Sequence, residues 1–306
     1  MKHNKVAFVF AGQGAQKVGM GADFYALFPE AKLVFDQVDS TIKTACFNGP
    51  QEVLNNTLIT QQALLVYGVA VAKVLESFNI KADICAGLSL GEYSALTYAK
   101  SLKVKDALQV VKRRSEIMSQ ALYDKDTTMM AVLNVSISDI KKVIDQASRF
   151  GICEIANFNS PTQTVLTGNK QALSYAKEKL QYYPKARVIP LSVTGAFHSN
   201  YLKDASDDFF DVLKTVEISK PSIDVVFNTT ATIEYENINE LLKRQLYSSV
   251  HWLKSIETMI HHGVDTFIEI SPKPIIKGFI RQIDPDLWCE CVSDESSLHN
   301  VLEALC

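Results

Sequence analysis

The chain has 306 residues, a formal net charge of −3, and 47% hydrophobic against 21% charged residues, the balance of an ordinary globular protein. This length suits one large domain or two modest ones, with a core that needs no disulfide or metal. The mild acidity gives no electrostatic footprint for nucleic acid or an anionic membrane, and the composition excludes collagen-like, disordered and disulfide-scaffold proteins.

The six cysteines are scattered along the chain without a C-x-x-C pair, so neither a zinc ribbon nor a thioredoxin-type site is expected. No metal is therefore expected. Free thiols without a recognisable export signal predict a cytoplasmic protein. The longest apolar stretch, residues 63–72, ends at Lys73 after about half the length that a bilayer span requires, so no membrane association is expected.

The first part of the chain alternates short apolar strands with helices. Residues 6–10 predict a buried strand, and the glycine-rich turn 11–16 follows it directly. An apolar strand that runs into a glycine loop is typical of an α/β domain with a parallel sheet. The next expected elements are an apolar helix at 61–78, a strand at 83–86, a helix at 92–99 and an amphipathic helix at 104–123.

From residue 128 the pattern predicts a β-α-β-β-α-β order, which is the ferredoxin-like arrangement. Its expected strands are 129–135, 152–156, 164–167 and 186–193, and its helices are 136–148, with Ser136 as N-cap, and 170–180. We interpret residues 128–197 as a small subdomain inserted into a larger α/β core of residues 1–127 and 198–306. Later elements of that core are expected at 202–215, 224–227, 238–246, 266–270 and from 294 onward.

The most specific motif is Gly87-Leu88-Ser89-Leu90-Gly91, a G-x-S-x-G between an expected strand and an expected helix. A nucleophile elbow has this arrangement, in which a tight turn exposes the serine hydroxyl. The backbone N–H of Leu90 would then lie at a helix N-terminus, where it can stabilise an oxyanion. The alternative is that Ser89 and Glu92 form a capping box and Ser89 only caps the helix.

The turn after the first strand contains Gly12-Gln13-Gly14. A dinucleotide fingerprint fails because position 17 is Lys17, and a Walker loop fails because Met20 follows Gly19. What remains is a loop that can present a backbone N–H, for instance that of Gln13, to an oxyanion at Ser89. The alternative is an ordinary tight turn.

A serine nucleophile needs a base, normally an imidazole that a second group holds. His198 follows the last expected strand of the small subdomain, and such strand-end loops often carry catalytic groups. We prefer His198 over His251, and either could instead be a structural histidine. The remaining histidines lie near the termini or in an exposed pair: His3, His261, His262 and His299.

Arg114 lies at the edge of the apolar face of the helix expected at 104–123. A guanidinium that points inward is costly unless it pairs with an anion. It would therefore either form an internal salt bridge with an Asp or Glu, or clamp the carboxylate of a substrate.

Several motifs together resemble one family, the malonyl-CoA:acyl-carrier-protein transacylases, the discrete malonyltransferases of type II fatty-acid synthesis. The similarity extends over essentially the whole chain. The matching stretches are residues 8–16 (FVFAGQGAQ), 87–95 (GLSLGEYSA), Arg114 with Met118, 157–168, 195–199, Gln245-Leu246-Tyr247, Val250 and Trp252.

This resemblance implies a hydrolase-like α/β core with an inserted ferredoxin-like subdomain. It implies that Ser89 is acylated, that His198 is its base and that Arg114 binds the malonyl carboxylate. It further implies that the amides of Gln13 and Leu90 form the oxyanion hole. In this family a backbone carbonyl, expected here near His251, orients the imidazole in place of a triad acid.

Two residues depart from the family pattern, and a third supports it. Family members commonly have histidine where this chain has Leu88, and often Gln or Arg where it has His251. Phe197, before the histidine, resembles the form found in malonyl-selective enzymes. We expect activity to survive the change at Leu88, because that residue flanks the nucleophile without serving as its base.

The resemblance thus implies ping-pong transfer of malonyl from malonyl-CoA to the phosphopantetheine thiol of acyl carrier protein, for fatty-acid biosynthesis. No bound cofactor is expected, and the chain is expected to be a monomer. The alternatives are a trans-acting acyltransferase of polyketide synthesis, a serine esterase or acyl hydrolase, and a catalytically silent carrier-protein or CoA-binding module.

Overall fold

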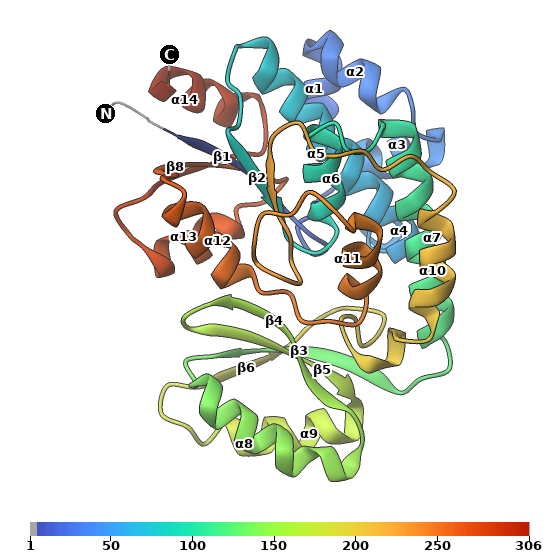
Figure 1. The fold of residues 1–306 in the computed structure, drawn as a ribbon, viewed down its shortest axis with the longest axis vertical. Coiled ribbons are helices and arrows are strands. Elements are labelled where there is room, and N and C mark those ends of the chain that lie inside the picture. Colours follow the sequence, from blue (N-terminus) through green and yellow to red (C-terminus); the bar gives the residue numbers. More distant parts are fainter. Residues whose placement is uncertain (1–4, 306) are drawn as a thin grey trace.

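Two sheets organise the molecule, one in each of two stacked parts (Figure 1). The computed structural model describes residues 5–305, so His3 and Cys306 lie outside the described part of the chain. The larger part contains a five-stranded sheet and the smaller part a four-stranded sheet. The predicted fold class, an α/β core with a ferredoxin-like subdomain, is confirmed.

The larger sheet is parallel throughout, with strand order β7-β2-β1-β8-β9. Its strands are β1 (Val6–Phe10), β2 (Ile84–Gly87), β7 (Asp224–Val226), β8 (Thr266–Ile270) and β9 (Trp288–Val292). Phe10 pairs with Gly87, so the glycine loop after β1 and the serine turn after β2 begin side by side. Both turns therefore lie at the carboxyl ends of the strands, where open parallel sheets usually bind their ligands.

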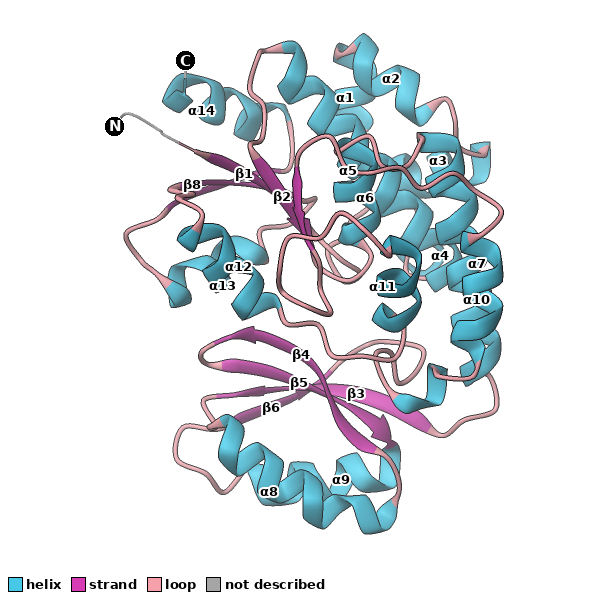
Figure 2. Ribbon diagram, in the orientation of Figure 1, coloured by secondary structure: helices cyan, strands magenta, loops and turns pink. Residues whose placement is uncertain are grey.

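Helices cover both faces of the larger sheet, which explains why its strands are apolar throughout (Figure 2). Phe8 and Phe10 face the core cluster that contains α5, whereas Ala7 and Val9 face the cluster of α12 and α13. The helices of this part are α1 (Ala22–Leu27), α2 (Pro29–Phe35), α3 (Ser40–Asn48), α4 (Gln51–Leu54), α5 (Thr57–Ser77), α6 (Gly91–Tyr98), α7 (Val104–Leu122), α10 (Ala205–Leu213), α11 (Ile238–Gln245), α12 (Trp252–His261), α13 (Ile276–Ile283) and α14 (Glu295–Leu305), with the short 3₁₀ turn Asn200–Leu202.

Helix α5 is the central helix of the core. It is long and apolar enough to cross a membrane, but 78% of its most apolar 18-residue stretch is buried inside the protein. It packs against α2, α6 and α7. It is therefore a core helix, and its length and hydropathy follow from burial on all sides.

The smaller sheet is antiparallel, with order β4-β5-β3-β6, and α8 and α9 cover one of its faces (Figure 2). Its elements are β3 (Thr127–Leu133), α8 (Ile137–Ala147), the 3₁₀ turn Ser148–Phe150, β4 (Cys153–Ser160), β5 (Gln163–Asn169), α9 (Lys170–Leu180) and β6 (Arg187–Pro190). Ser136 caps α8 by accepting from the N–H of Asp139, as the sequence predicts. The division at residues 128 and 197 remains a prediction.

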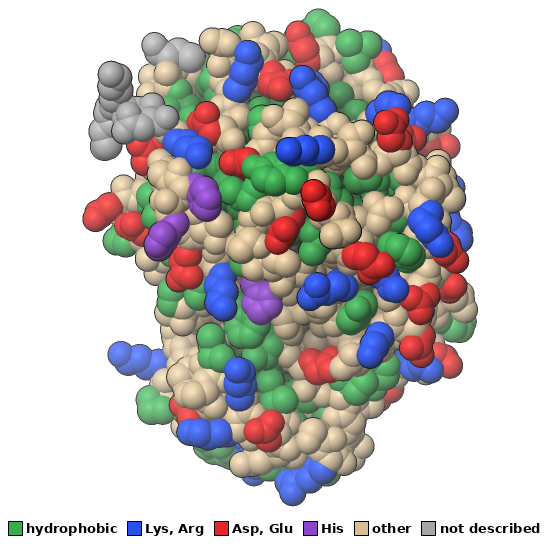
Figure 3. All heavy atoms as spheres, viewed as in Figure 1, with side chains coloured by type: hydrophobic (Ala, Val, Ile, Leu, Met, Phe, Trp, Pro, Cys, Tyr) green, Lys and Arg blue, Asp and Glu red, His purple; other side chains and the backbone are tan. Residues whose placement is uncertain are grey.

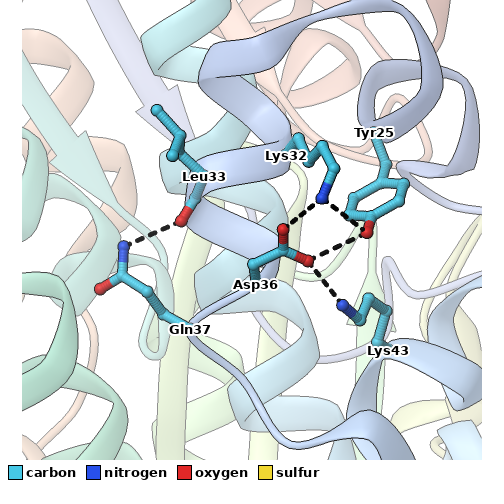
Figure 4. Close-up of polar contacts among 6 residues, drawn as sticks. All are labelled: Tyr25, Lys32, Leu33, Asp36, Gln37 and Lys43. Atoms are coloured by element: carbon cyan, nitrogen blue, oxygen red, sulfur yellow. Dashed lines mark hydrogen bonds and ion pairs between the residues drawn. The ribbon is translucent and has the colours of Figure 1, made fainter.

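A surface cluster of charges connects the first three of the short helices between residues 22 and 54 (Figure 4). The Asp36 carboxylate, at the end of α2, accepts from the Tyr25 hydroxyl at 2.9 Å and from Lys43 at 2.7 Å, and it also pairs with Lys32. Both lysines also lie over the Tyr25 ring. The cluster thus joins α1, α2 and α3.

Candidate active site

Ser89 occupies a sharp turn between β2 and α6, and its backbone is strained. Its φ is +52°, in the left-handed region that residues other than glycine rarely adopt. The flanking glycines provide room: a Cβ on Gly91 would come within 2.2 Å of the Phe10 carbonyl oxygen, and one on Gly87 within 1.9 Å of the Gly91 carbonyl carbon. The elbow thus packs directly against the end of β1 and carries its strain at the serine.

Residues 89 and 198 meet, although they lie far apart in the sequence. The Oγ of Ser89 is 2.7 Å from Nε2 of His198, which is 4% exposed. His198 also has a positive φ, +55°. Two strained residues in direct contact are typical of a functional site, because surrounding structure must hold them there.

The carbonyl that orients His198 belongs to Gln245, and the expectation of His251 is wrong. Nδ1 of His198 donates to the Gln245 carbonyl at 2.8 Å. Gln245 is the last residue of α11, where a helix leaves its final carbonyls without intrahelical partners. His251 instead stacks on Phe158, with ring centroids 5.2 Å apart, and its N–H donates to the Asn228 carbonyl.

Burial sets the charge state of His198. Burial, and secondly the positive charge of Arg114, lower the pKa of His198 to about 4. The imidazole is therefore neutral at neutral pH, with Nδ1–H committed to Gln245. Nε2 is then free to accept the proton of the Ser89 hydroxyl.

Ser89 is not the cap of α6, which rules out the capping-box alternative. The N-cap of α6 is Leu90, which has no side-chain cap. Glu92, the expected capping partner, accepts instead from the backbone N–H of Asn228 at 2.6 Å.

Arg114 is buried beside Ser89 with neutral partners. It is 1% exposed; Nη1 donates to the Gln61 side chain at 2.9 Å and Nη2 to the Gln245 side chain at 3.1 Å. Nη2 also lies 3.4 Å from Ser89 Oγ. Within residues 5–305 no carboxylate forms a salt bridge with Arg114, so the internal salt-bridge alternative is wrong. The amides orient the guanidinium without neutralising it, which suits the site to an anion.

The two expected oxyanion donors lie next to the nucleophile. Gln13 follows β1, and Leu90 precedes the first turn of α6; both line the cavity that contains Ser89. No hydrogen bond between described residues uses the backbone N–H of Gln13 or Leu90. The Gln13 side chain donates to Thr57 at 3.2 Å, which anchors this loop to the start of α5.

The cavity over Ser89 lies between the two sheets and has a volume of about 220 Å³. The smaller sheet lines it with apolar Met129, Ala131 and Val165 and with polar Asn157, Asn159 and Gln163. It is enclosed enough for a small acyl group. Among the described residues no cluster of His, Cys, Asp or Glu could hold a metal ion.

Sequence reasoning missed four polar residues around the nucleophile: Gln61, Glu92, Asn228 and the side chain of Gln245. The sequence indicates Glu92 only as a capping partner of Ser89, and Gln245 only as part of a motif. Each acts through a contact with a residue distant in the sequence, for which a single sequence has no local signal. The side chain of Gln245 illustrates this, because its Nε2 donates to the Ser89 carbonyl across 156 positions.

The chain is similar to known proteins over nearly its whole length. The family model described as "Acyl transferase domain" matches residues 7–284. The chain is 36% identical to the malonyl CoA-acyl carrier protein transacylase of Bacillus subtilis, over 99% of this chain and 98% of that protein. The crystal structure of the Clostridium perfringens enzyme of the same name superposes with a TM-score of 0.94 at 37% identity, covering 99% and 97% of the two chains.

A third relative extends the comparison to a carrier-protein complex. It is a malonyl-transacylase solved together with its type II PKS acyl-carrier protein. It superposes with a TM-score of 0.94 at 33% identity, over 98% of this chain and all of that one.

Proposed function

Because this chain belongs to the family of malonyl CoA-acyl carrier protein transacylases, we propose that Ser89 carries the malonyl group between two thiols. The enzyme is an [acyl-carrier-protein] S-malonyltransferase of fatty-acid synthesis. The observation that supports our assignment of residues most strongly is the convergence of His198 Nε2 and Arg114 Nη2 on the Ser89 hydroxyl, at 2.7 and 3.4 Å. A base and a carboxylate-binding cation on one hydroxyl suit acyl transfer from an acidic thioester.

In the first half-reaction Ser89 Oγ attacks the thioester carbonyl of malonyl-CoA while His198 takes the hydroxyl proton. The bond from Oγ to carbon forms, the carbon–sulfur bond breaks, and His198 returns the proton to the departing CoA thiolate. The lowered pKa of His198 keeps it unprotonated before each attack. The Gln245 carbonyl fixes the tautomer that leaves Nε2 free.

The backbone amides of Gln13 and Leu90 are proposed to hold the tetrahedral oxyanion. Both line the cavity beside Ser89, and the amide of Leu90 adds the dipole of the α6 N-terminus. Losing one donor of such a pair costs on the order of 10²–10³ in rate.

Arg114 is proposed to bind the free carboxylate of the malonyl group. The side-chain amides of Gln61 and Gln245 hold the guanidinium of Arg114 in one orientation, so the side chain loses little conformational freedom when the carboxylate binds. Selectivity for malonyl over acetyl follows, because acetyl leaves the buried cation unpaired.

In the second half-reaction the phosphopantetheine thiol of acyl carrier protein attacks the malonyl-serine ester, and His198 takes the thiol proton and returns it to Ser89. The proposal includes malonyl-CoA as substrate, acyl carrier protein as partner, a monomeric chain and a cytoplasmic location. Positive and negative side chains are interspersed on the face drawn in Figure 3, so that face has no uniformly positive surface.

The decisive experiment is intact-mass measurement after mixing the protein with malonyl-CoA. We expect a stable increase of one malonyl group, lost on addition of holo acyl carrier protein and absent from Ser89→Ala. Rapid hydrolysis without accumulation would instead indicate the esterase, and no adduct at all would indicate the silent binding module. An esterase is disfavoured because no carboxylate is bonded to His198 within residues 5–305.

Polyketide synthesis remains the second candidate for the carrier, because the relative solved with a type II PKS acyl-carrier protein is similar over the full chain. Transfer rates to a fatty-acid carrier and to a polyketide carrier, measured side by side, decide between them. Faster transfer to the fatty-acid carrier is expected.

A further inference from the structure

The side chain of Asn228 lies directly against the nucleophile elbow, outside every role described so far. Its Oδ1 accepts from the backbone N–H of Ser89 at 2.7 Å, and its Nδ2 donates to the carbonyl of Gly87 at 2.7 Å. We infer that Asn228, held by Glu92, is the positioning residue that fixes the strained backbone of Ser89 for attack. This inference rests on the proposed role of Ser89 as the acylated residue.

The contact pattern explains why an asparagine is suited to this position. Strand β7 pairs with β2 in parallel, and the last paired residues are Val226 and Ala86. Asn228 comes two residues after Val226, where the strand has ended. The side-chain amide of Asn228 offers one donor and one acceptor, as a backbone peptide group of a longer β7 strand would. It uses them to bind the Gly87 carbonyl and the Ser89 N–H, on the two sides of the turn.

Asn228 is itself fixed on its other side. It is fully buried; its backbone N–H donates to Oε2 of Glu92 at 2.6 Å, and its carbonyl accepts from the N–H of His251 at 2.9 Å. Donors and acceptors of both its backbone and its side chain are therefore in use. Because the amide has no freedom to turn, its two contacts with the elbow have a single geometry.

Glu92 is suited to hold Asn228 without competing for the cation of the site. It lies in the first turn of α6 and is fully buried. Burial raises the pKa of Glu92 to about 8, so the carboxyl group is mainly neutral at neutral pH. A neutral acid still accepts from the Asn228 N–H, and it leaves the charge of Arg114 available to the malonyl carboxylate.

The link to the reaction is the strain at Ser89. A left-handed serine persists only where its surroundings over-determine it. Without the Asn228 amide, the Ser89 N–H and the Gly87 carbonyl would both lose their side-chain partner, and the turn could relax. The hydroxyl would then leave its 2.7 Å contact with His198, whereas the Arg114 contacts with Gln61 and Gln245 would remain.

The first test is the single-turnover acylation rate of Asn228→Ala with malonyl-CoA. We expect the maximal rate to fall about 10²-fold, the size of effect that a displacement near 1 Å produces. We expect KM to change less than about threefold, because the carboxylate clamp is intact. A maximal rate within about twofold of wild type would overturn the inference.

A conservative pair at Glu92 tests the support of Asn228 separately. Glu92→Gln keeps an oxygen that can accept from the Asn228 N–H, so its rate should stay within about threefold of wild type. Glu92→Leu removes the acceptor and should lose about tenfold or more in maximal rate at unchanged KM. Equal rates in the two variants would contradict the role of Glu92.

The matched control is Tyr67→Phe, which deletes a buried hydrogen bond to the Val292 carbonyl away from the cavity. It should lower thermal stability and leave the acylation rate unchanged. If Asn228→Ala does not fold, Asn228→Asp is measured instead; it keeps the acceptor for Ser89 but places an oxygen against the Gly87 carbonyl. Its maximal rate should fall about tenfold or more, and a wild-type rate would overturn the inference.

These outcomes are separable from a failure of the proposed function. If wild-type protein forms no malonyl-serine, the proposed role of Ser89 fails. If wild type is acylated and the Asn228 variants are acylated equally fast, only the positioning role fails.

Discussion

Arg114 and Asp36 each collect several polar contacts, but their surroundings are opposite. Asp36 lies on the surface and is met by two lysines and a tyrosine (Figure 4). Hydrogen bonds, first from Lys32 and then from Lys43 and Tyr25, hold the pKa of the Asp36 carboxyl well below its usual range. Arg114 is 1% exposed and is held by two neutral amides.

The difference separates a charge with oppositely charged partners inside the protein from a charge whose partners there are neutral. The charge of Asp36 is already balanced in the free protein, and an exposed cluster of this kind contributes little to stability. The charge of Arg114 is oriented but not balanced, and burying such a cation destabilises the free protein. The carboxylate of a bound acyl group neutralises this charge. The free energy that the buried cation costs the free protein is thereby recovered on binding, which favours acidic acyl groups over neutral ones.

The largest expected effect comes from removing the unbalanced charge. Arg114→Ala should lower kcat/KM for malonyl-CoA by about 10²-fold, because a bidentate charged pair is lost. Turnover of acetyl-CoA should change far less, so the preference between the two should reverse. Competition assays with both acyl-CoAs measure this directly, and unchanged malonyl selectivity would reject the clamp.

A smaller loss of activity is expected when position 114 keeps its positive charge but loses the planar guanidinium. Arg114→Lys should lower kcat/KM for malonyl-CoA by about tenfold and keep malonyl preferred over acetyl. Lysine has one ammonium group and cannot reach Gln61, Gln245 and a carboxylate with the same geometry. Activity equal to wild type would show that only charge matters at this position.

The pH dependence of kcat/KM tests whether the positive charge of Arg114 also lowers the pKa of His198. The pKa of His198 is lowered to about 4, first by burial and then by Arg114, so the acid limb of kcat/KM should lie well below 6.5. In Arg114→Ala that limb should move upward, since the repulsion is gone while the burial remains. An acid limb near 6.5 in wild type would contradict this account.

The same shift has a consequence for stability with a defined sign. The unfolded chain binds a proton at His198 below about pH 6.5, whereas the folded protein binds it only near pH 4. His198 therefore makes no difference above pH 6.5, and the protein loses stability as the pH falls from 6.5 towards 4. His198→Gln should flatten this part of the stability curve, measured by denaturant unfolding at several pH values.

The smallest effect is expected at the balanced surface charge. Asp36→Asn should shift the thermal midpoint by less than about 2 °C, because exposed ion pairs contribute little. The acylation rate should stay at the wild-type value. A marked loss of activity would show that helices α1 to α3 influence the site and would weaken the contrast with Arg114.

Much of the fold follows from contiguous patterns in the sequence. The helix Lys170–Leu180 and the strand Thr266–Ile270 have the bounds that their patterns predict. Strand β9 was missed because it is short and Glu290 interrupts its apolar run, and it is identified by its pairing with β8. Helix α13 was missed because it is short and directly follows a proline-containing turn.

The site divides in the same way. Ser89 is predictable because its motif is local, and His198 because it lies in the loop after the last strand of the small subdomain, although β6 ends at Pro190, before the expected end at residue 193. The role of the Gln245 carbonyl could not be predicted. It depends on where the end of α11 lies in space relative to His198, which is 47 positions earlier in the chain. Asn228 contacts Ser89 across 139 positions, and only the pairing of β7 with β2 brings the two together.

Residues 249–251 join the smaller sheet to the larger part of the protein. Val250 exchanges backbone hydrogen bonds with β4, donating to the Ala156 carbonyl at 2.8 Å and accepting from Phe158 at 2.9 Å. Gln245, whose carbonyl accepts from the imidazole of His198, lies four residues before this segment, and the last residue of the segment, His251, donates its backbone N–H to the Asn228 carbonyl. Residues 245–251 therefore link the smaller sheet to both members of the catalytic pair: Gln245 binds the imidazole of His198, and His251 binds Asn228, which in turn binds the backbone of Ser89.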